Sequence, residues 1–241
     1  MRLDLFIHER GDAASRTEAK GFIIGGYVKV DGRIILKPSF EVDVSSYVEV
    51  DTSGKKYVSR GGLKLEAALD AFGIDPKGRV CIDVGASSGG FTDCLLQRGA
   101  LHVTAVDSGT GQMAESLRAD GRVSSVENYN ARYMKPDDFP YSYSLAVMDV
   151  SFISATYIIP ALRTVLDAGS DFICLVKPQF EVGRAGLGKG GIVKDEGLRL
   201  SAVRKVTDFA EQNGFSLLGT IKSPIKGGDG NTEYLVHFKV R

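Results

Sequence analysis

Residues 80–92, V-C-I-D-V-G-A-S-S-G-G-F-T, determine the fold expected for most of the chain. The stretch opens with an apolar run, turns through three glycines, and continues from Phe91 with a helical pattern. This order of strand, glycine-rich turn and helix lets backbone N–H groups and a helix N-terminus surround a small polar ligand. Glycine is needed because the chain bends sharply and approaches that ligand without a Cβ. We therefore expect a nucleotide-type cofactor at this turn.

A second apolar run, residues 102–106, ends at Asp107, where doubly wound folds place an acid that holds a ribose hydroxyl pair. The pattern then alternates, with strands expected at 123–126, 145–149, 172–176, 215–221 and 234–240 and helices at 155–166 and 196–213. Such alternation predicts an α/β, Rossmann-like domain whose mainly parallel sheet is covered on both faces. These sheets bind ligands beyond the carboxyl ends of their strands, where Asp107, Asp149 and Lys177 are expected.

Two other enzyme classes have partial matches. The turn G-A-S-S-G fits the nucleophile elbow of α/β hydrolases with Ser87 as nucleophile, but the only later histidines, His102 and His237, lie in expected strands. Residues 183–190 nearly match a nucleotide-phosphate-binding loop, but Gly190 replaces the hydroxyl residue that would hold magnesium. Both readings are disfavoured, and we expect residues 183–191 to form a mobile loop on the substrate side. A glycine turn without a ligand stays an open alternative.

The composition is that of an ordinary globular protein, with 43% hydrophobic and 25% charged residues. The formal net charge is zero, so any contact with nucleic acid must come from a local patch. No uncharged apolar run approaches the roughly 18–20 residues of a membrane span, and charges interrupt the apolar N-terminus, so neither a membrane protein nor a signal peptide is expected. Cys81, Cys94 and Cys174 are odd in number and widely spaced, which predicts reduced thiols, no metal site and a cytoplasmic location.

Residues 1–59 are expected to form a separate small α+β unit, joined by a linker at about 51–60 to a second domain over 60–241. Ser15 and Glu18 form a capping-box pattern that predicts a helix ending at Gly25-Gly26. Asp31-Gly32 between two β-rich runs predicts a hairpin, and residues 42–50 are a further strand-like stretch. Basic and acidic residues are nearly balanced over residues 1–60, so charge alone favours a solvated helix face over an RNA contact.

The motifs R-L-D-L, S-R-T-E-A-K, I-I-G-G-Y-V-K-V-D-G and K-P-S-F resemble the small RNA-binding module named after ribosomal protein S-four. This resemblance implies that RNA docks on the basic helix and hairpin. Arg16 and Lys20 would be the main phosphate contacts, with Arg2 and Arg60 as further RNA-binding candidates.

A lysine and two acids near the predicted ligand edge suggest proton-transfer chemistry. Lys177 follows an apolar strand, and it either forms a structural ion pair with Asp149 or acts together with Asp149, Lys64 and Glu233. A partly desolvated lysine near another cation has its charged form disfavoured and can accept a proton. A ribose 2′-hydroxyl gains from such a base, and methyl transfer from a sulfonium needs in-line positioning and removal of that proton.

The order Lys64, Asp149, Lys177, Glu233 resembles the K-D-K-E tetrad of FtsJ-like ribose 2′-O-methyltransferases. The segments S-R-G-G-L-K-L, D-V-G-A-S-S-G-G-F-T-D, V-M-D-V-S-F-I-S, L-V-K-P-Q-F-E and N-T-E-Y-L together resemble the TlyA family, also called hemolysin A, over essentially the whole chain. The resemblance implies S-adenosylmethionine as cofactor, ribosomal RNA or ribosomal subunits as partner, and a cytidine 2′-oxygen as acceptor.

The resemblance also implies roles for individual residues. Lys177 would accept the proton, Asp149 and Glu233 would orient and tune it, and Lys64 would position the ribose. The residues expected to line the methionine end of the cofactor are Gly85, Ser87, Gly89 and Gly90. Asp107 would bind the adenosine ribose, and Asn130 would lie beside the adenine. Further cofactor-binding candidates are Asp83, Ala86, Phe91 and Asp149.

Two rival functions follow from the same resemblance. A hemolysin would permeabilise membranes, but the sequence has no bilayer span and no helix with a strongly basic face opposite a broad apolar one. An RNA-binding assembly protein with an inactive methyltransferase domain would have lost part of the tetrad, whereas all four residues are present. The sequence therefore favours an active methyltransferase.

Overall fold

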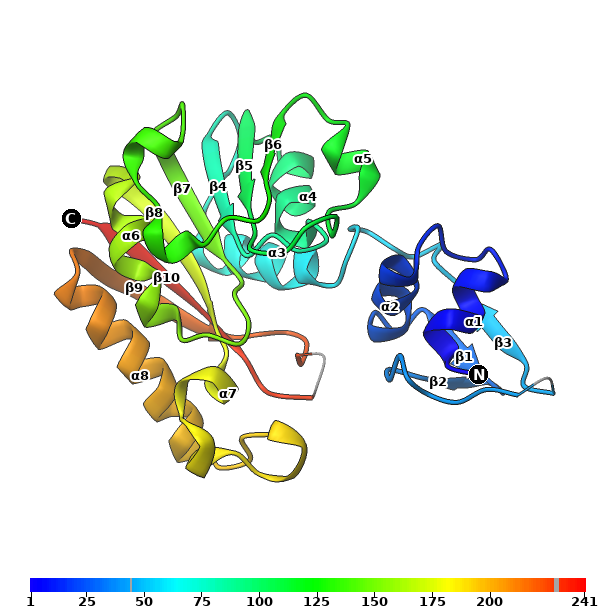
Figure 1. Ribbon diagram of the computed structural model, residues 1–241. Coiled ribbons are helices and arrows are strands. Elements are labelled where there is room, and N and C mark those ends of the chain that lie inside the picture. Colours follow the sequence, from blue (N-terminus) through cyan, green and yellow to red (C-terminus); the bar gives the residue numbers. More distant parts are fainter. Residues whose placement is uncertain (44, 228–229) are drawn as a thin grey trace. The chain divides into compact units, whose positions relative to one another are not determined.

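The computed structural model describes residues 1–43, 45–227 and 230–241 (Figure 1). The chain divides into two compact units, Met1–Arg60 and Gly61–Arg241. Each unit has its own secondary structure and its own apolar core. Within the described residues, every helix is too short or too polar to span a lipid bilayer.

The first unit packs two helices against a small antiparallel sheet. α1 (Leu3–Glu9) and α2 (Arg16–Ile24) precede three strands in the order β2-β1-β3, namely β1 (Val28–Val30), β2 (Arg33–Ile34) and β3 (Val48–Val50). The expected hairpin forms, because Asp31 and Gly32 adopt φ values of 51° and 75°, as its tight turn requires. Of the strand-like stretch expected at 42–50 only β3 is a strand, and residue 44 lies outside the described residues.

The start of α2 differs in detail from the predicted capping box. The Ser15 hydroxyl accepts a hydrogen bond from the Glu18 N–H at 3.1 Å, as expected. The Glu18 carboxylate, however, accepts from the N–H of Ala14 at 2.9 Å and not from that of Ser15. The reciprocal bond is therefore shifted by one residue while still satisfying a backbone donor before the first turn.

The second unit contains a seven-stranded sheet with the order β6-β5-β4-β7-β8-β10-β9 (Figure 1). The parallel strands are β4 (Val80–Val84), β5 (His102–Val106), β6 (Val123–Val126), β7 (Tyr143–Met148) and β8 (Leu166–Val176). β10 (Tyr234–Val240) pairs antiparallel with β8 and with β9 (Phe215–Lys222). The prediction of a mainly parallel, Rossmann-like sheet is confirmed, with an antiparallel pair at one edge.

Helices cover both faces of this sheet. They are α3 (Gly61–Phe72), α4 (Gly90–Gln97), α5 (Glu115–Arg118), α6 (Ile159–Thr164), α7 (Pro178–Glu181) and α8 (Glu196–Gln212). Alternate residues of β4 show the two faces: Ile82 belongs to the core that contains Leu162 of α6 and Val206 of α8, whereas Asp83 contacts Thr92 of α4. The glycine turn lies at the carboxyl end of β4, between this strand and α4.

The helix expected over residues 155–166 is interrupted. The structure has a 3-10 turn, Ala155–Tyr157, followed by α6, with Pro160 in the first turn of α6. Proline has no N–H and fits only the first turn of a helix, so a continuous helix through this position would lose a hydrogen bond and clash. The second segment therefore begins anew just before Pro160.

Candidate active site

The glycine turn connects β4 to α4 and packs against the end of β7. Gly85 and Gly89 have φ values of 86° and 93°, and Ser87 has a φ of 48°. A Cβ on Gly85 would lie 2.6 Å from the carbonyl oxygen of Asp149, so only glycine allows this close approach. The N–H of Asp149 donates to the Val84 carbonyl at 2.9 Å. The expected cofactor turn and Asp149 are therefore neighbours.

Asp83 of β4 links the two ends of the turn, because it is bonded to Thr92 of α4. Its side chain is fully buried, and it accepts a hydrogen bond from the Thr92 hydroxyl at 2.7 Å. Burial raises the pKa of the Asp83 carboxyl to about 7. Because the side chain has no exposed surface, we revise its expected role from cofactor contact to support of the turn. Phe91 is also buried, with 3% of its surface exposed, so its side chain is not open to a cofactor.

Asp107 lies at the end of β5, where a ribose-binding acid is expected. Its carboxylate accepts hydrogen bonds from the backbone N–H groups of Ser87 at 2.8 Å and Gly109 at 2.7 Å. A carboxylate has about four lone-pair sites, so Asp107 keeps capacity for hydroxyl donors. The structure thus joins the turn after β4 to the acid after β5.

Asn130 follows β6 and lies on the neighbouring loop. The N–H of Tyr129 donates to the Asp107 carbonyl at 2.9 Å, which holds this loop beside Asp107. The Asn130 side chain is exposed and accepts from the Arg132 N–H at 3.2 Å. Its place at the open edge agrees with a role beside the adenine, and that role stays a prediction.

Lys64 and Glu233 form a buried ion pair. Lys64 projects from α3, and its Nζ lies 2.6 Å from Glu233 Oε2, with the side chains only 10% and 2% exposed. Gly227 lies directly against the Glu233 carboxylate, because a Cβ at position 227 would overlap its Oε1. Two residues 169 positions apart in the sequence are therefore held in one geometry.

Lys177 and Asp149 form the second pair. Lys177 Nζ lies 2.6 Å from Asp149 Oδ1, and it donates a hydrogen bond to the Ser151 hydroxyl at 2.7 Å. The lysine follows β8 directly and caps the start of α7, where Pro178 fixes the chain. Ser151 was not among the residues expected from the sequence; its position two residues after Asp149 is the only signal that could have indicated it.

The sheet register brings the two pairs to the same edge. Tyr234 of β10 is opposite Val176 of β8, so Glu233 and Lys177 come just beyond the same rung. Met148 of β7 is opposite Cys174 of β8, which places Asp149 at this end as well. Two amines and two carboxylates thus gather beside the glycine turn, and their charges balance.

Phe152 is an exposed aromatic residue next to the tetrad. Its side chain is 92% exposed, its φ is 65°, and its ring centroid lies 5.3 Å from that of Phe180. A positive φ is an outlier for a bulky residue, and such strain is typical of functional sites. Phe152 was not among the residues expected from the sequence, although an aromatic residue in the polar loop after Asp149 was a visible signal.

The basic residues expected to bind RNA in the first unit have mixed surroundings. Arg2 and Arg16 both donate to the fully buried Asp4, at 3.0 and 3.1 Å. The hydrogen bond from Arg2 is the main reason that the pKa of Asp4 is lowered to about 2. Lys20 is exposed on α2, and Arg60 is half-buried. The two arginines therefore have a structural role, with roughly half of each side chain still open to solvent.

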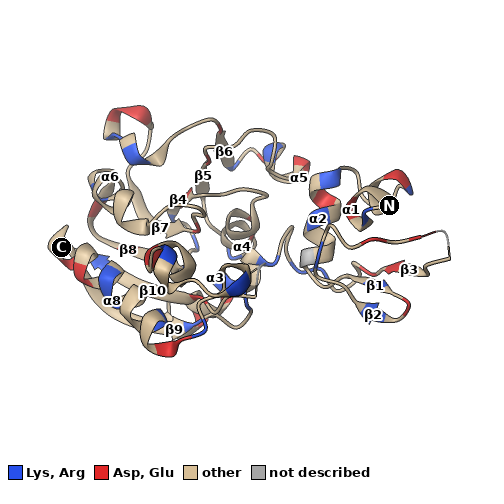
Figure 2. Ribbon diagram, turned by 60° about the horizontal axis from the view of Figure 1, so that its bottom comes forward, with Lys and Arg blue, Asp and Glu red and all other residues tan. Residues whose placement is uncertain are grey.

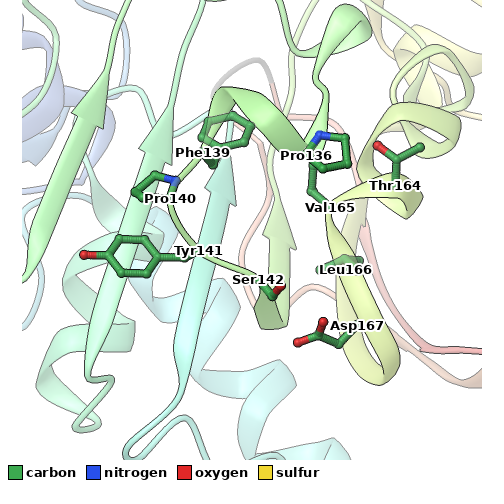
Figure 3. A pocket seen from close by; sticks show the side chains of 9 residues that line it. All are labelled: Pro136, Phe139, Pro140, Tyr141, Ser142, Thr164, Val165, Leu166 and Asp167. Carbon is green, nitrogen blue, oxygen red and sulfur yellow. The ribbon is translucent and has the colours of Figure 1, made fainter.

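A pocket of about 220 Å³ lies away from this chemistry (Figure 3). It is lined by residues of the loop before β7 and of the start of β8, namely Pro136, Phe139, Pro140, Tyr141, Ser142, Thr164, Val165, Leu166 and Asp167. The tetrad lies after the opposite ends of the same strands, so the pocket is not part of the candidate site. Within the described residues, no group of three or more His, Cys, Asp or Glu side chains is arranged to hold a metal ion.

Comparisons with known proteins agree with this arrangement. Residues 57–240 match the FtsJ-like methyltransferase family, and residues 1–46 match the S4 domain. The 16S/23S rRNA (cytidine-2′-O)-methyltransferase TlyA of Mycobacterium tuberculosis is 43% identical, over 100% of this chain and 90% of the relative. Hemolysin A of Brachyspira hyodysenteriae is 42% identical, over 99% of both chains.

Solved structures give the same result. A structure from Streptococcus thermophilus is 43% identical, has a TM-score of 0.80, and covers 100% of this chain and 88% of that one. An S-adenosylmethionine-dependent methyltransferase from Mesorhizobium loti shares only the fold, at 14% identity and a TM-score of 0.52 over 72% of this chain and 96% of that one. The chain therefore belongs to the FtsJ-like methyltransferase family and, within it, to the group that contains TlyA and hemolysin A.

Proposed function

We propose that this protein methylates a ribose 2′-oxygen of ribosomal RNA, with cytidine as the acceptor nucleotide and S-adenosylmethionine as the methyl donor. The observation that carries the proposal is the pair of lysine–carboxylate contacts, Lys64–Glu233 and Lys177–Asp149, beside the glycine turn. The family match and the named activity of the M. tuberculosis relative support the same reaction and acceptor.

The residues at the turn fit the proposed cofactor. α4 begins at Gly90, and its N-cap Gly89 offers no side-chain cap. The Thr92 N–H donates to Asp83, while the start of a helix still favours a carboxylate such as that of the methionine end. Asp107 keeps free lone pairs for ribose hydroxyls. When bound, S-adenosylmethionine supplies a methyl group made electrophilic by its sulfonium. We assign its binding to the turn residues Gly85, Ala86, Ser87, Gly89 and Gly90, to the acids Asp107 and Asp149, and to Asn130.

The tetrad would hold the ribose oxygen and accept its proton. Lys177 Nζ, in its neutral amine form, would accept the proton of the 2′-hydroxyl as that oxygen takes the methyl group. The bond between the methyl carbon and the sulfur would break, with S-adenosylhomocysteine as the leaving group. Asp149 and Ser151 keep the amine in place through the contacts described above. Lys64, fixed by Glu233, positions the oxygen in line with the methyl group. In such a reaction positioning and one proton transfer supply most of what the protein must contribute.

Phe152 offers a surface for the base of the same nucleotide. Bases stack on exposed aromatic rings in a way that tolerates different sequences. The ring is nearly fully exposed and follows Ser151, which contacts Lys177. Stacking here would carry the attached ribose toward the tetrad.

We also propose a division of labour between residues 1–59, which recruit RNA, and residues 60–241, which carry out methyl transfer. The S4-domain match supports the first role. Lys20 is exposed on α2, and Arg2 and Arg16 keep part of their guanidinium groups open. A cytoplasmic location, expected from the three reduced cysteines, stays a prediction.

Methyl transfer by the purified protein tests the proposal. The protein is mixed with isotope-labelled S-adenosylmethionine and ribosomal subunits from cells that lack it, and the RNA is digested to nucleosides. We expect label in 2′-O-methylcytidine with the wild type and with Lys77→Ala, a control that removes an exposed cation at the opposite edge of the sheet. We expect label lower by about 100-fold or more with Lys177→Ala. Label on a base, or no transfer by the wild type, would overturn the proposal.

A further inference from the structure

Two loop segments beside the tetrad carry cations and no acids, although Asp195 follows the first and Asp229 follows the second in the sequence. Residues 183–194 contain Arg184, Lys189 and Lys194, and residues 222–227 contain Lys222 and Lys226. All five side chains are exposed, and within the part of the chain that the structure describes none of them forms an ion pair. Acidic and basic residues both occur over much of the two units (Figure 2). Residues 52–65 are another stretch with four cations and no acid, but there Lys55 and Lys64 are paired with Glu18 and Glu233.

One buried side chain joins the two loops. Asn231 is only 1% exposed, and its Oδ1 accepts from the Val193 N–H at 2.9 Å while its Nδ2 donates to the Gly191 carbonyl at 3.1 Å. Its own carbonyl accepts from the Gly227 N–H at 2.9 Å. Both loops are therefore fixed to Asn231, and the cations they carry share one support.

The same support fixes the loops to the tetrad. Glu233 follows Asn231 by two residues, and Gly227 packs directly against its carboxylate. On the other side, Lys177 begins the segment that leads through α7 into residues 183–194. In Figure 1 the yellow segment before α8 and the orange-red segment between β9 and β10 extend from the same edge of the sheet. The five cations thus lie on two segments that are tied to the end of the sheet that carries the tetrad.

The chemistry of this surface fits a chain of phosphates. Lysine and arginine without acidic partners attract phosphate groups, and a neutral protein needs such a local patch to bind RNA. Five cations spread over two loops match a series of separate phosphates better than one nucleotide triphosphate. Gly190 also lacks the hydroxyl that a magnesium-bound triphosphate would require. The near-match to a phosphate-binding loop is thereby explained without an NTPase activity.

We propose that residues 183–194 and 222–227, joined by Asn231, bind the phosphate backbone of the substrate RNA on either side of the target nucleotide. This inference rests on the proposed function, because it names how the RNA is held at the same site. It predicts that part of the affinity for RNA resides in the methyltransferase unit and not only in residues 1–59.

Salt dependence of RNA binding tests the inference. Binding of ribosomal subunits from cells that lack the protein is measured over a range of monovalent salt at constant Mg²⁺, for the wild type and for Arg184→Ala/Lys189→Ala. Each lost phosphate contact lowers the slope of log affinity against log salt by about 0.7–0.9, so we expect a decrease of about 1.4–1.8. The KM for subunits should rise, with the calorimetric affinity for S-adenosylmethionine unchanged. The control is Lys77→Ala/Arg204→Ala, which removes two exposed cations outside these loops.

The outcomes separate this inference from the proposed function. Unchanged slope and KM in the loop variant, with active wild type, would overturn the inference and leave the function intact. An inactive wild type whose salt slope still depends on Arg184 and Lys189 would overturn the function and keep the RNA surface. If the alanine variant unfolds at a lower temperature than the wild type, Arg184→Gln/Lys189→Gln is compared instead. These substitutions remove the charges and keep part of the aliphatic side chains. A surface that serves an acidic protein would leave RNA binding unaffected, which also contradicts the inference.

Discussion

Two fully buried aspartates, one in each unit, have pKa values that are shifted in opposite directions. Asp4 in the first unit accepts hydrogen bonds from Arg2 and Arg16, and these contacts lower its pKa to about 2. Asp83 in the second unit accepts hydrogen bonds from the hydroxyl and the backbone N–H of Thr92, which are neutral donors, and burial raises its pKa to about 7. Burial disfavours the charged form in both cases, so the partner decides the outcome.

The basic residues of the two units differ in the same way, according to whether an acid lies beside them. Arg2 and Arg16 are used to neutralise Asp4, so their presence in a basic-looking motif does not by itself mean that they bind RNA. Lys177 is paired with Asp149 at an open edge, and the cations of residues 183–194 have no acidic partner in the described structure. A basic residue is thus assigned to structure, chemistry or RNA by the acid beside it.

The largest effect is expected from replacing Lys177. Its partner Asp149 is another paired carboxylate, and this pair has a proposed role in the chemistry and not only in the fold. Lys177→Ala should lower methyl transfer by about 10²–10⁴-fold, the usual worth of a general base, while binding of S-adenosylmethionine is kept. Lys177→Arg retains a cation beside Asp149 but cannot take up a proton, so it should be similarly inactive. Single-turnover rates measure both. An active arginine variant would reduce Lys177 to a charge that merely positions the substrate.

Replacing Asp83, the buried acid whose described partner Thr92 carries no charge, should change how the free energy of unfolding depends on pH. The folded-state pKa of Asp83 lies above its unfolded value, so its contribution is present below about pH 4 and is lost as the pH rises through about 7. Relative to Asp83→Asn, the wild type should lose up to about 4 kcal/mol between pH 4 and pH 8. Urea unfolding of the two proteins at each pH checks this. A constant difference would show that Asp83 is not protonated in the folded state.

Asp4, the buried acid paired with two arginines, should contribute to stability with the opposite dependence on pH and a smaller amplitude. The folded-state pKa of Asp4 is depressed, so its stabilisation is present above about pH 4 and is lost as the pH falls through about 2. Asp4→Asn should cost about 1–3 kcal/mol at neutral pH, because two arginines lose their charged partner. Amide hydrogen exchange in residues 1–60 measures the loss. Equal loss of protection in the second unit would contradict the separation of the two units.

The smallest effect is expected at Asn231, which links the tetrad to the cationic loops. Asn231→Asp keeps the acceptor for the Val193 N–H and removes the donor to the Gly191 carbonyl. One lost hydrogen bond of about 1 kcal/mol should raise the KM for ribosomal subunits several-fold, with little change in kcat or in cofactor affinity. Steady-state kinetics separates the two parameters. A fall in kcat alone would mean that Asn231 acts through Glu233 and not through the loops.

Much of the second unit was predictable, because its information is local. The strand–turn–helix at residues 80–92 and the alternation that follows it depend on short-range patterns, and they gave the Rossmann-like sheet with the four tetrad residues at its edge. The interrupted helix at 155–166 was missed although Pro160 is visible in the sequence, because apolar spacing outweighed one residue.

The unpredicted features depend on contacts between distant segments. The choice of Asp4 as partner for Arg16, the support of two loops by Asn231, and the hydrogen bond from Lys177 to Ser151 join residues 12 to 40 positions apart. Periodicity and motifs carry no information on which of several polar residues will meet in this way. The exposure of Phe152 was hidden for the same reason, since an aromatic residue in a loop is more often buried than exposed.

The most direct test of the central claim is mapping of ribose methylation in ribosomal RNA by mass spectrometry. Cells that lack the protein are complemented with the wild type, with Lys177→Ala or with Lys77→Ala at equal expression. We predict that at least one cytidine carries a 2′-O-methyl group with the wild type and Lys77→Ala and is unmodified with Lys177→Ala. Identical methylation maps in all three strains would contradict the account.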